Sequence, residues 1–283
     1  MTPRTVSDPA SLRQSLDAVR RQGKTIGFVP TMGALHRGHT SLMNLARAAN
    51  DFVVVSVFVN PTQFGPNEDF TRYPRPLTQD LELCAAAGVD LVFLPTPEVM
   101  YPPGFCTHVD VSGLTDVLCG ARRPGHFRGV TTVVLKLFNL VGADRAYFGQ
   151  KDAQQVRVIR QMVRDLDVPV QIVVGPTVRE ADGLALSSRN QYLDAAQRRE
   201  APVLFHALQE MQASIAAGEL DAAALRRRMI ERIAVAPSAV LDYAEVLDAE
   251  TLQPLDRLRG SVLLAVAVKF GATRLIDNLL VEA

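Results

Sequence analysis

The sequence predicts an α/β protein with a doubly wound parallel sheet in its N-terminal part and a smaller α/β domain after it. An apolar stretch suited to a buried strand, residues 25–29, leads through a small turn into an amphipathic helix that ends near residue 50. Residues 52–59 then form a continuous apolar run, which is typical of a parallel strand buried on both faces. Strand, helix and strand in this order favour a right-handed crossover and therefore a parallel sheet.

The other elements are predicted from apolar spacing and turn residues. Helices are expected at residues 11–22, 77–87, 130–141 and 155–162. Strands are expected at residues 89–94, 107–111, 144–148 and 169–174. After Tyr192, helices rich in Ala, Leu and Arg precede three strands, with the helices at 194–217 and 221–234 and the strands at 240–246, 261–268 and 273–279. We place the domain boundary near Gly183, which separates residues 1–183 from residues 184–283.

Charge and composition argue against several classes of protein. The 283 residues include 30 Lys plus Arg and 30 Asp plus Glu, and a net charge of zero gives no support for binding nucleic acid or a membrane surface. The N-terminus lacks the apolar core of a signal peptide, and no run approaches the ~20 apolar residues of a membrane span. Cys84, Cys106 and Cys119 form no metal or disulfide pattern, so we expect reduced thiols in a cytoplasmic protein.

The segment from Ile26 to His39, IGFVPTMGALHRGH, combines a strand, a tight turn and two histidines at the start of a helix. Residues three apart lie on one helical face, so His36 and His39 can contact the same ligand. The first N–H groups of a helix are unpaired and carry partial positive charge, which favours a phosphate. Gly33 and Gly38 lack a Cβ and let a ligand approach the backbone. Half of a zinc site, or two histidines without a role, are the alternatives.

Polar residues follow the second strand and recur in a later basic segment. Asn60 and Gln63 lie beyond the carboxyl end of a parallel strand, where ligands bind in open sheets. Their amides can hydrogen-bond to a polar small molecule, or the segment only forms a turn. Residues 66–76 are expected to form a mobile loop. The arginines of residues 122–129 either face a substrate anion or pair with acidic neighbours, and His126 is expected to be a hydrogen-bonded loop histidine.

A third strand–turn–helix unit and a later turn supply further candidates. Gly149 marks the turn, Lys151 supplies a cation for a phosphate, and Asp152 either accepts from ribose hydroxyls or caps the helix. Gln155 lies one turn after Lys151 on the same face. The two hydroxyls and the arginine of residues 187–189 either clamp a polyphosphate or cap a helix.

Five blocks of these residues occur together in one order: PTMGALHRGH, VNPTQF, RPGHFRGV, FGQKDAQQ and READGLALSSRN. In this combination the chain closely resembles the pantoate–β-alanine ligase family, most densely between residues 25 and 190. The resemblance implies a Rossmann-like nucleotidyltransferase fold, with nucleotide and pantoate bound by domain 1–183. It also implies a two-step ligation. ATP and (R)-pantoate give pantoyl adenylate and pyrophosphate, and β-alanine then displaces AMP to give pantothenate.

The resemblance implies roles for individual residues. His36, His39 and Lys151 stabilise charge on the α-phosphate, with His39 as the proton donor. The residues implied to bind ATP are Met32, Gly33, Ala34, Leu35, His36, Arg37, Gly38, His39, Gly149, Gln150, Lys151, Asp152, Val178, Leu186, Ser187, Ser188 and Arg189. Gln63 and Gln155 are implied to bind pantoate, with Gln63 also beside β-alanine and Asn60 close by. Mg²⁺ accompanies the ATP phosphates with Asp80 as a candidate ligand, and the family implies a homodimer.

Two departures and two rival functions accompany this resemblance. Leu186 stands where many members carry Met, a swap that keeps volume, and Cys119 stands where many carry Glu, which puts an ion pair of that carboxylate in doubt. One rival is an adenylyltransferase that acts on a phosphate monoester, but the neutral amides of Gln63 and Gln155 suit a hydroxy acid better than a phosphate dianion. The other is a nucleotide-binding regulatory module without turnover. Intact His36, His39 and Lys151 argue against this alternative.

Overall fold

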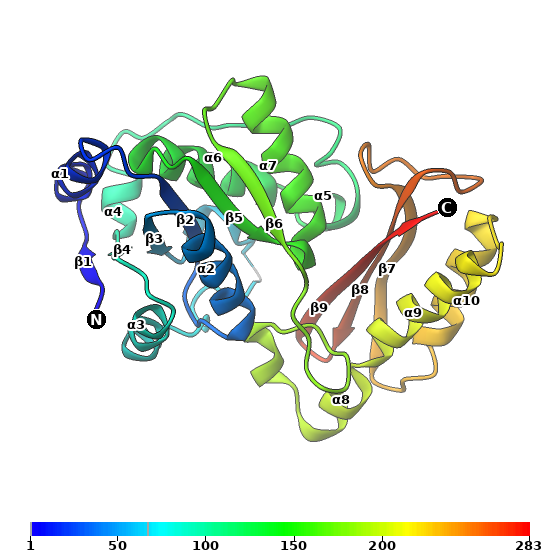
Figure 1. Cartoon of the computed structure of the whole chain (residues 1–283). Coiled ribbons are helices and arrows are strands. Elements are labelled where there is room, and N and C mark those ends of the chain that lie inside the picture. The colour runs from blue at the N-terminus through cyan, green and yellow to red at the C-terminus, as the bar shows by residue number, and fades with distance from the viewer. Residues whose placement is uncertain (1, 67) are drawn as a thin grey trace. The chain divides into compact units, whose positions relative to one another are not determined.

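The computed structural model of the chain describes residues 2–66 and 68–283 (Figure 1). Asn67, which falls in the loop expected at residues 66–76, therefore lies outside the described residues. None of the helices in the described residues has the length and apolar character needed to cross a membrane.

The chain divides into two compact units. The first comprises Met1–Gly149 and Gln155–Pro176, and the second comprises Gln150–Gln154 and Thr177–Ala283. The short segment Gln150–Gln154 thus belongs with the C-terminal part of the chain, although it lies between two stretches of the first unit in sequence. The domain boundary near Gly183 stays a prediction.

The first unit is built around a six-stranded parallel sheet with strand order β1-β4-β3-β2-β5-β6. The strands are β1 (Arg4–Val6), β2 (Ile26–Thr31), β3 (Phe52–Val57), β4 (Leu91–Phe93), β5 (Arg145–Gly149) and β6 (Gln171–Gly175). From β2 the chain crosses to β3 on one side, while β5 lies on the other side of β2. The carboxyl ends of β2 and β5 therefore form a topological switch point, where open α/β sheets bind ligands. The predicted doubly wound sheet is confirmed.

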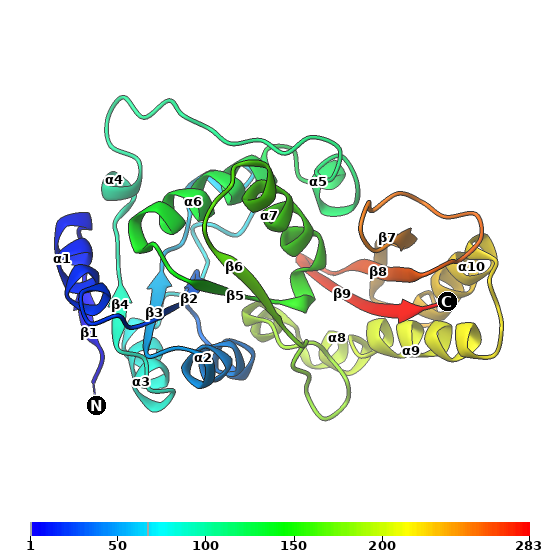
Figure 2. The same ribbon diagram turned by 45° about the horizontal axis from the view of Figure 1, so that its top comes forward.

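Helices cover both faces of this sheet. The helices are α1 (Pro9–Arg20), α2 (Arg37–Ala49), α3 (Leu77–Ala86), α4 (Pro97–Met100), α5 (Leu118–Arg122), α6 (His126–Val141) and α7 (Ala153–Asp165). α2 and α3 lie on one face, and α6 and α7 lie on the opposite face (Figure 2). Leu42 and Met43 of α2 are buried in one cluster with Val53 and Val55 of β3. Burying each such side chain contributes about 1.5–3 kcal/mol, which anchors the helix that carries the two histidines.

One expected strand of the first unit is wrong, and another was missed. Residues 107–111 form no strand, because the backbone of Val109 is bonded to side chains of α6 instead. The N–H of Val109 donates to Oγ1 of Thr132 at 3.0 Å, and its carbonyl oxygen accepts the hydroxyl of Thr131. β1 pairs in parallel with the distant strand β4, a partner that no local pattern indicates.

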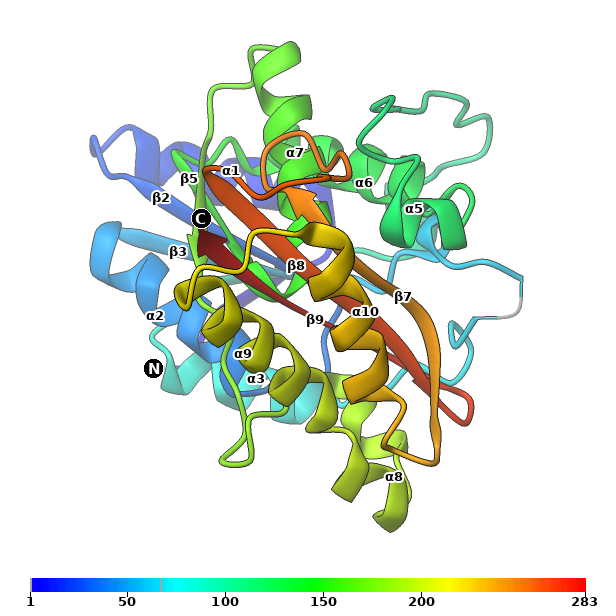
Figure 3. The same ribbon diagram turned by 90° about the vertical axis from the view of Figure 1, so that its right-hand side faces the viewer.

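The second unit is a three-stranded antiparallel sheet covered by helices. Its strands, in the order β7-β8-β9, are β7 (Ala239–Asp248), β8 (Ser261–Phe270) and β9 (Thr273–Glu282). Its helices are α8 (Ala195–Glu200), α9 (Val203–Ala216) and α10 (Ala222–Ile233). α9 and α10 lie across the sheet, and Leu208 and Leu225 are buried against Leu264 and Val266 (Figure 3). The helix expected at residues 194–217 is broken before α9 at Pro202, which has no N–H to donate.

Candidate active site

The turn between β2 and α2 places two histidines in the first turn of the helix. α2 begins at Arg37, and His36 is its N-terminal cap. Nδ1 of His36 accepts a hydrogen bond from the N–H of Gly38, and Nδ1 of His39 accepts one from the N–H of His36, both at 3.2 Å. The two ring centroids are 4.1 Å apart. The imidazoles therefore lie side by side at the carboxyl end of β2.

These contacts determine which ring nitrogen carries the proton. A ring nitrogen that accepts a hydrogen bond has no proton of its own, so in the neutral ring the proton lies on Nε2. His36 and His39 both use Nδ1 as an acceptor, which makes Nε2 the donor in each ring. They sit where the first N–H groups of α2 and its dipole favour negative charge. The arrangement can donate two imidazole hydrogen bonds to one phosphate group.

Asp80 of α3 contacts the turn that precedes these histidines. Its side chain is 1% exposed, and it accepts the N–H groups of Ala34 and Leu35 at 3.0 and 2.7 Å, one on each oxygen. Over the described ranges, 2–66 and 68–283, no three His, Cys, Asp or Glu side chains form a group that could hold a metal ion. The assignment of Asp80 as a metal ligand stays a prediction. The sequence did not indicate its contact with the turn.

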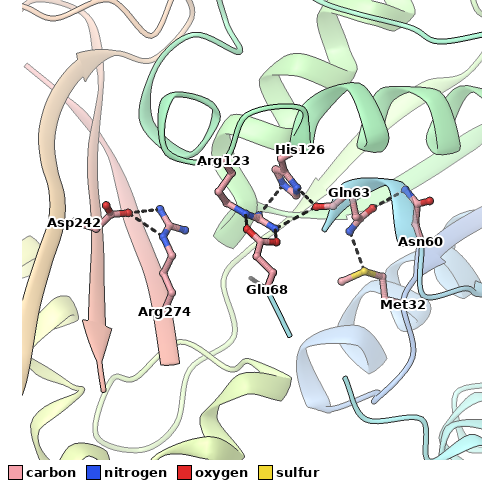
Figure 4. Close-up of polar contacts among 8 residues, drawn as sticks. All are labelled: Met32, Asn60, Gln63, Glu68, Arg123, His126, Asp242 and Arg274. Atoms are coloured by element: carbon pink, nitrogen blue, oxygen red, sulfur yellow. Dashed lines mark hydrogen bonds and ion pairs between the residues drawn. The ribbon is translucent and has the colours of Figure 1, made fainter. Parts of the chain in front are cut away.

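Asn60 and Gln63 form a bonded pair of amides after β3 (Figure 4). Nδ2 of Asn60 donates to Oε1 of Gln63 and to the carbonyl oxygen of Gly129, both at 3.1 Å, and its Oδ1 accepts the Tyr101 hydroxyl at 2.7 Å. Nε2 of Gln63 donates to Sδ of Met32 at 2.9 Å. Asn60 is only 1% exposed and uses both amide atoms within the protein, so it fixes the direction in which Gln63 presents its N–H donors.

A second network holds the backbone of Gln63 (Figure 4). Arg123 forms a bidentate ion pair with Glu68 at 2.6 Å, and its Nη1 lies 2.9 Å from Nε2 of His126. Nδ1 of His126 lies 2.8 Å from the carbonyl oxygen of Gln63. Burial raises the pKa of Glu68, but the hydrogen bond and the charge of Arg123 outweigh burial and leave this pKa below its ordinary value. Arg123 thus pairs with an acidic neighbour, one of the two alternatives that the sequence left open.

Two further candidates lie on β5 and α7 of the first unit. Gly149 ends β5 at the switch point, and the space beside it is open, since an added Cβ would meet nothing within 4 Å. Gln155 is half-buried on α7. The lack of a side chain at Gly149 would let a ligand approach the backbone there.

In the second unit, Asn278 of β9 holds the short helix η2 (Gln150–Asp152). Its Nδ2 donates to the carbonyl oxygens of Gln150 and Lys151 at 3.1 and 2.9 Å, and its Oδ1 accepts Nε2 of Gln150 at 3.1 Å. Nζ of Lys151 lies 3.9 Å from Oδ1 of Asp152. Asn278 is 4% exposed, and no local pattern in the sequence indicates its role, because its partners Gln150 and Lys151 lie far away along the chain.

The other second-unit candidates lie on a paired turn. The N–H of Leu186 donates to the carbonyl oxygen of Val178 at 2.9 Å. Ser187 caps the short helix η3 (Ser188–Tyr192), with its Oγ 3.3 Å from the N–H of Arg189. The alternative reading of these hydroxyls as a cap therefore applies at least to Ser187. The predicted residues fall into two sets: residues 32–39, Asn60, Gln63, Asp80, Gly149 and Gln155 in the first unit, and residues 150–152, Val178 and residues 186–189 in the second.

The three thiols should differ sharply in reactivity. Cys84 is fully buried, and burial together with the charge of Asp80 raises its pKa to about 12, while Cys119 is also buried and Cys106 is exposed. At about pH 8, iodoacetamide should modify Cys106 in the folded protein and Cys84 at least about 10³-fold more slowly, as the scarcity of its thiolate implies. Peptide mass spectrometry measures both rates, and denatured protein, in which all three thiols react, is the control. Similar rates at Cys84 and Cys106 in folded protein would contradict this expectation.

The chain is similar to known proteins over nearly its whole length. A family model described as pantoate-beta-alanine ligase matches residues 4–280. A curated pantothenate synthetase from Moorella thermoacetica is 60% identical over 273 residues, 96% of each chain, and one from Acetivibrio thermocellus is 56% identical over 278 residues, 98% of each. The crystal structure of pantothenate synthetase from Thermus thermophilus matches with a TM-score of 0.94 at 52% identity, covering 99% of this chain and 100% of that one.

A fourth relative was solved with small molecules. The pantoate-beta-alanine ligase from Francisella tularensis, complexed with beta-gamma ATP and β-alanine, matches with a TM-score of 0.81 at 36% identity and covers 98% of this chain and 97% of its own. The family model and these relatives each span both units. The chain therefore belongs to the pantoate–β-alanine ligase family, whose reaction is the ATP-dependent condensation of pantoate with β-alanine.

Proposed function

We propose that the condensation of (R)-pantoate with β-alanine proceeds through a pantoyl adenylate. A carboxylate oxygen of pantoate attacks the α-phosphorus of ATP, the bond from that phosphorus to the bridging oxygen breaks, and pyrophosphate leaves. The β-alanine amine then attacks the acyl carbon, AMP leaves, and the amine nitrogen loses a proton. Adenylation makes this possible because oxide is a poor leaving group from a carboxylate, whereas AMP is a good one.

The paired imidazole donors at the start of α2 carry this proposal. Both Nδ1 atoms accept backbone N–H groups, so both Nε2 atoms are donors. We assign His36 and His39 to the phosphate oxygens on which negative charge grows as pantoate attacks, with His39 as the proton donor. The preceding residues of the turn, from Met32 onward, line the phosphates. A pre-oriented pair of donors stabilises this charge without reorganising during the step.

We assign the remaining ATP contacts from the family resemblance alone; the relative from Francisella, solved with beta-gamma ATP, supports ATP as the substrate. Lys151 adds a cation at the phosphates, and Gly149, Gln150, Asp152 and Val178 hold the adenosine part. Asn278 acts through them, because it fixes the backbone of Gln150 and Lys151. The residues that complete the phosphate contacts are Leu186, Ser187, Ser188 and Arg189.

Gln63 and Gln155 are assigned to pantoate, and Gln63 also to β-alanine. The geometry supports a donor role for Gln63, because Asn60 occupies its Oε1 and leaves Nε2 as the group directed toward Met32. An amide donor can hydrogen-bond to a carboxylate or a hydroxyl without adding charge. Asn60 serves as the partner that orients Gln63.

Replacing Gln63 with glutamate should raise the KM for pantoate by at least about tenfold, because it converts a neutral donor into an anion beside a carboxylate substrate. Steady-state kinetics at saturating ATP measures this change. Gln14→Glu, which adds the same charge on the exposed face of α1, is the matched control and should leave KM unchanged. An unaltered pantoate KM in Gln63→Glu would show that Gln63 does not contact the acid.

We further propose that Mg²⁺ arrives with the ATP phosphates as part of the substrate. The described residues supply no acidic cluster for it, and both oxygens of Asp80 already accept backbone N–H groups. Mg²⁺ commonly binds through substrate phosphates and few protein ligands. A homodimer and a cytoplasmic location are proposed from the family resemblance and the reduced thiols.

Isotope transfer tests the adenylate directly. Pantoate labelled with oxygen-18 in its carboxylate is incubated with the protein, MgATP and β-alanine, and the products are analysed by mass spectrometry. The proposal requires one oxygen-18 atom in the phosphate of AMP, because the attacking carboxylate oxygen stays on the α-phosphorus. Label in inorganic phosphate would indicate an acyl phosphate instead. AMP transfer to a phosphate monoester, with none of the label in AMP, would favour the adenylyltransferase alternative.

A further inference from the structure

The turn that leads into the two histidines has an unusual backbone. Gly33 has φ +79° and Ala34 has φ +49°, so two consecutive residues adopt the left-handed conformation. Glycine adopts it without penalty, but alanine does so at a cost, since its Cβ crowds the carbonyl group. Such a conformation persists only where surrounding contacts hold it. Leu35 and then His36 follow directly, so the path of this turn decides where α2 begins.

Asp80 supplies the contacts that hold the turn. Its Oδ2 accepts the N–H of Ala34 at 3.0 Å, and its Oδ1 accepts the N–H of Leu35 at 2.7 Å. Gly33 packs directly on the carboxylate, because an added Cβ would lie 2.9 Å from Oδ2 and 2.9 Å from Cγ1 of Val57. The glycine, the strained alanine and the carboxylate thus form one fitted arrangement.

Burying a carboxylate is unfavourable unless hydrogen bonds compensate it. Burial raises the pKa of Asp80, while its bonds to Leu35 and Ala34 act in the opposite direction. A negative charge close to a phosphate-binding turn would also repel an anion. The structure nevertheless retains it at this position, with both oxygens turned to the backbone.

We propose that Asp80 is a positioning residue, which holds residues 33–35 in the left-handed turn and thereby sets the histidine pair for the phosphates of ATP. This inference rests on the proposed function of His36 and His39. Asp80 acts on catalysis only through the turn. A carboxylate suits this task because it can accept both N–H groups at once, whereas an asparagine accepts on one atom and presents N–H donors on the other.

The test combines Asp80→Asn with His39→Ala. Asp80→Asn should lower pantoate-dependent pyrophosphate exchange and overall turnover by about 10²-fold, because a displacement of about 1 Å in a reacting group can cost that much. In a protein that already carries His39→Ala, the same change should cost distinctly less, no more than about tenfold, since one of the two histidines that it positions is gone. If Asp80→Asn lowers turnover by the same factor in the His39→Ala protein as in the wild type, the proposal is overturned, even if His39 itself proves essential. Retained activity in His39→Ala would instead refute the proposed function of His39.

Asp90→Asn is the matched control. The Asp90 carboxylate also accepts a backbone N–H, that of Val53 at 2.7 Å, and it pairs with Arg47. This contact is made at the start of β3, away from the carboxyl end of the strand. It should alter thermal stability without lowering turnover more than about twofold, within the scatter of surface substitutions. If Asp80→Asn proves unfolded, Asp80→Glu keeps the charge but displaces the turn, and the same double-variant comparison with His39→Ala applies.

Two readouts separate positioning from other roles. In amide nuclear magnetic resonance spectra, the signals of Ala34 and Leu35 should lose their protection from hydrogen exchange in Asp80→Asn but keep it in Asp90→Asn. The Mg²⁺ concentration for half-maximal activity should stay unchanged in Asp80→Asn. Retained protection of both amides would overturn the proposal. So would a tenfold or larger rise in the Mg²⁺ requirement, which would make Asp80 a metal ligand.

Discussion

Replacing His39 with alanine is expected to lower turnover by about 10²- to 10³-fold, comparable with the loss of one oxyanion-hole donor. The substitution removes the Nε2 donor that faces the phosphates in the proposed mechanism. It also removes Nδ1, which accepts the N–H of His36 at the start of α2. Steady-state and single-turnover kinetics, with the free energy of unfolding measured alongside, separate the catalytic loss from the structural one.

Two conservative variants identify the responsible nitrogen of His39. Asparagine places an acceptor near Nδ1 but offers no donor near Nε2, whereas glutamine places an amide donor near Nε2. We expect Gln to retain more turnover than Asn. His206→Ala, an exposed histidine on α9, is the control and should be neutral. Near-normal turnover in folded His39→Ala protein would contradict the role assigned to this residue.

Replacing Arg179 with alanine is expected to reduce the free energy of unfolding by about 3–5 kcal/mol, because it leaves a buried carboxylate uncompensated. Arg179 forms a bidentate ion pair with Asp277 at 2.6 and 2.9 Å, and the Asp277 side chain is only 2% exposed. The guanidinium also donates to the carbonyl oxygen of Gly183 and lies 3.7 Å from the centroid of the Phe205 ring. Urea unfolding monitored by circular dichroism measures the loss.

Arg128→Ala is the matched control for this ion pair. Arg128 pairs with Asp110 at 2.8 Å, but both side chains are more than half exposed, so its loss should cost no more than about 1 kcal/mol. Replacing both Arg179 and Asp277 with apolar residues should destabilise less than Arg179→Ala alone, because no buried charge is left behind. Equal losses in Arg179→Ala and Arg128→Ala would contradict the assignment.

The parts of the fold that the sequence predicted depend on local patterns. The β2–α2–β3 crossover follows from a continuous apolar run and from helical spacing, and the structure confirms both. The segment 107–111 has the composition of a strand, yet the backbone of Val109 forms hydrogen bonds to threonine side chains of α6. These partners come close only when the chain is folded, so local sequence does not indicate them. Pro202 breaks the helix expected at residues 194–217, and its missing N–H was a signal available in the sequence.

At the candidate site, too, local patterns were predictable from the sequence and long-range contacts were not. The spacing of His36 and His39 predicted that they could share a face, and the structure places their rings side by side. The residues that hold the site were not singled out in these roles: Asp80 for the turn, Asn278 for η2 and Glu68 for Arg123. Each of these acts across a long sequence separation, where neither periodicity nor motif spacing carries information. The roles assigned to the phosphate and substrate contacts stay predictions.

Exchange of labelled pyrophosphate into ATP tests the adenylate mechanism most directly. Purified protein, Mg²⁺, ATP and (R)-pantoate are mixed without β-alanine, and label in ATP is followed over time. The proposed mechanism predicts exchange that depends on pantoate, and release of AMP and pantothenate once β-alanine is added. No exchange from folded protein that binds ATP would contradict a separate, reversible adenylation step. If a phosphate monoester supports exchange in place of pantoate, the protein would instead be assigned as an adenylyltransferase.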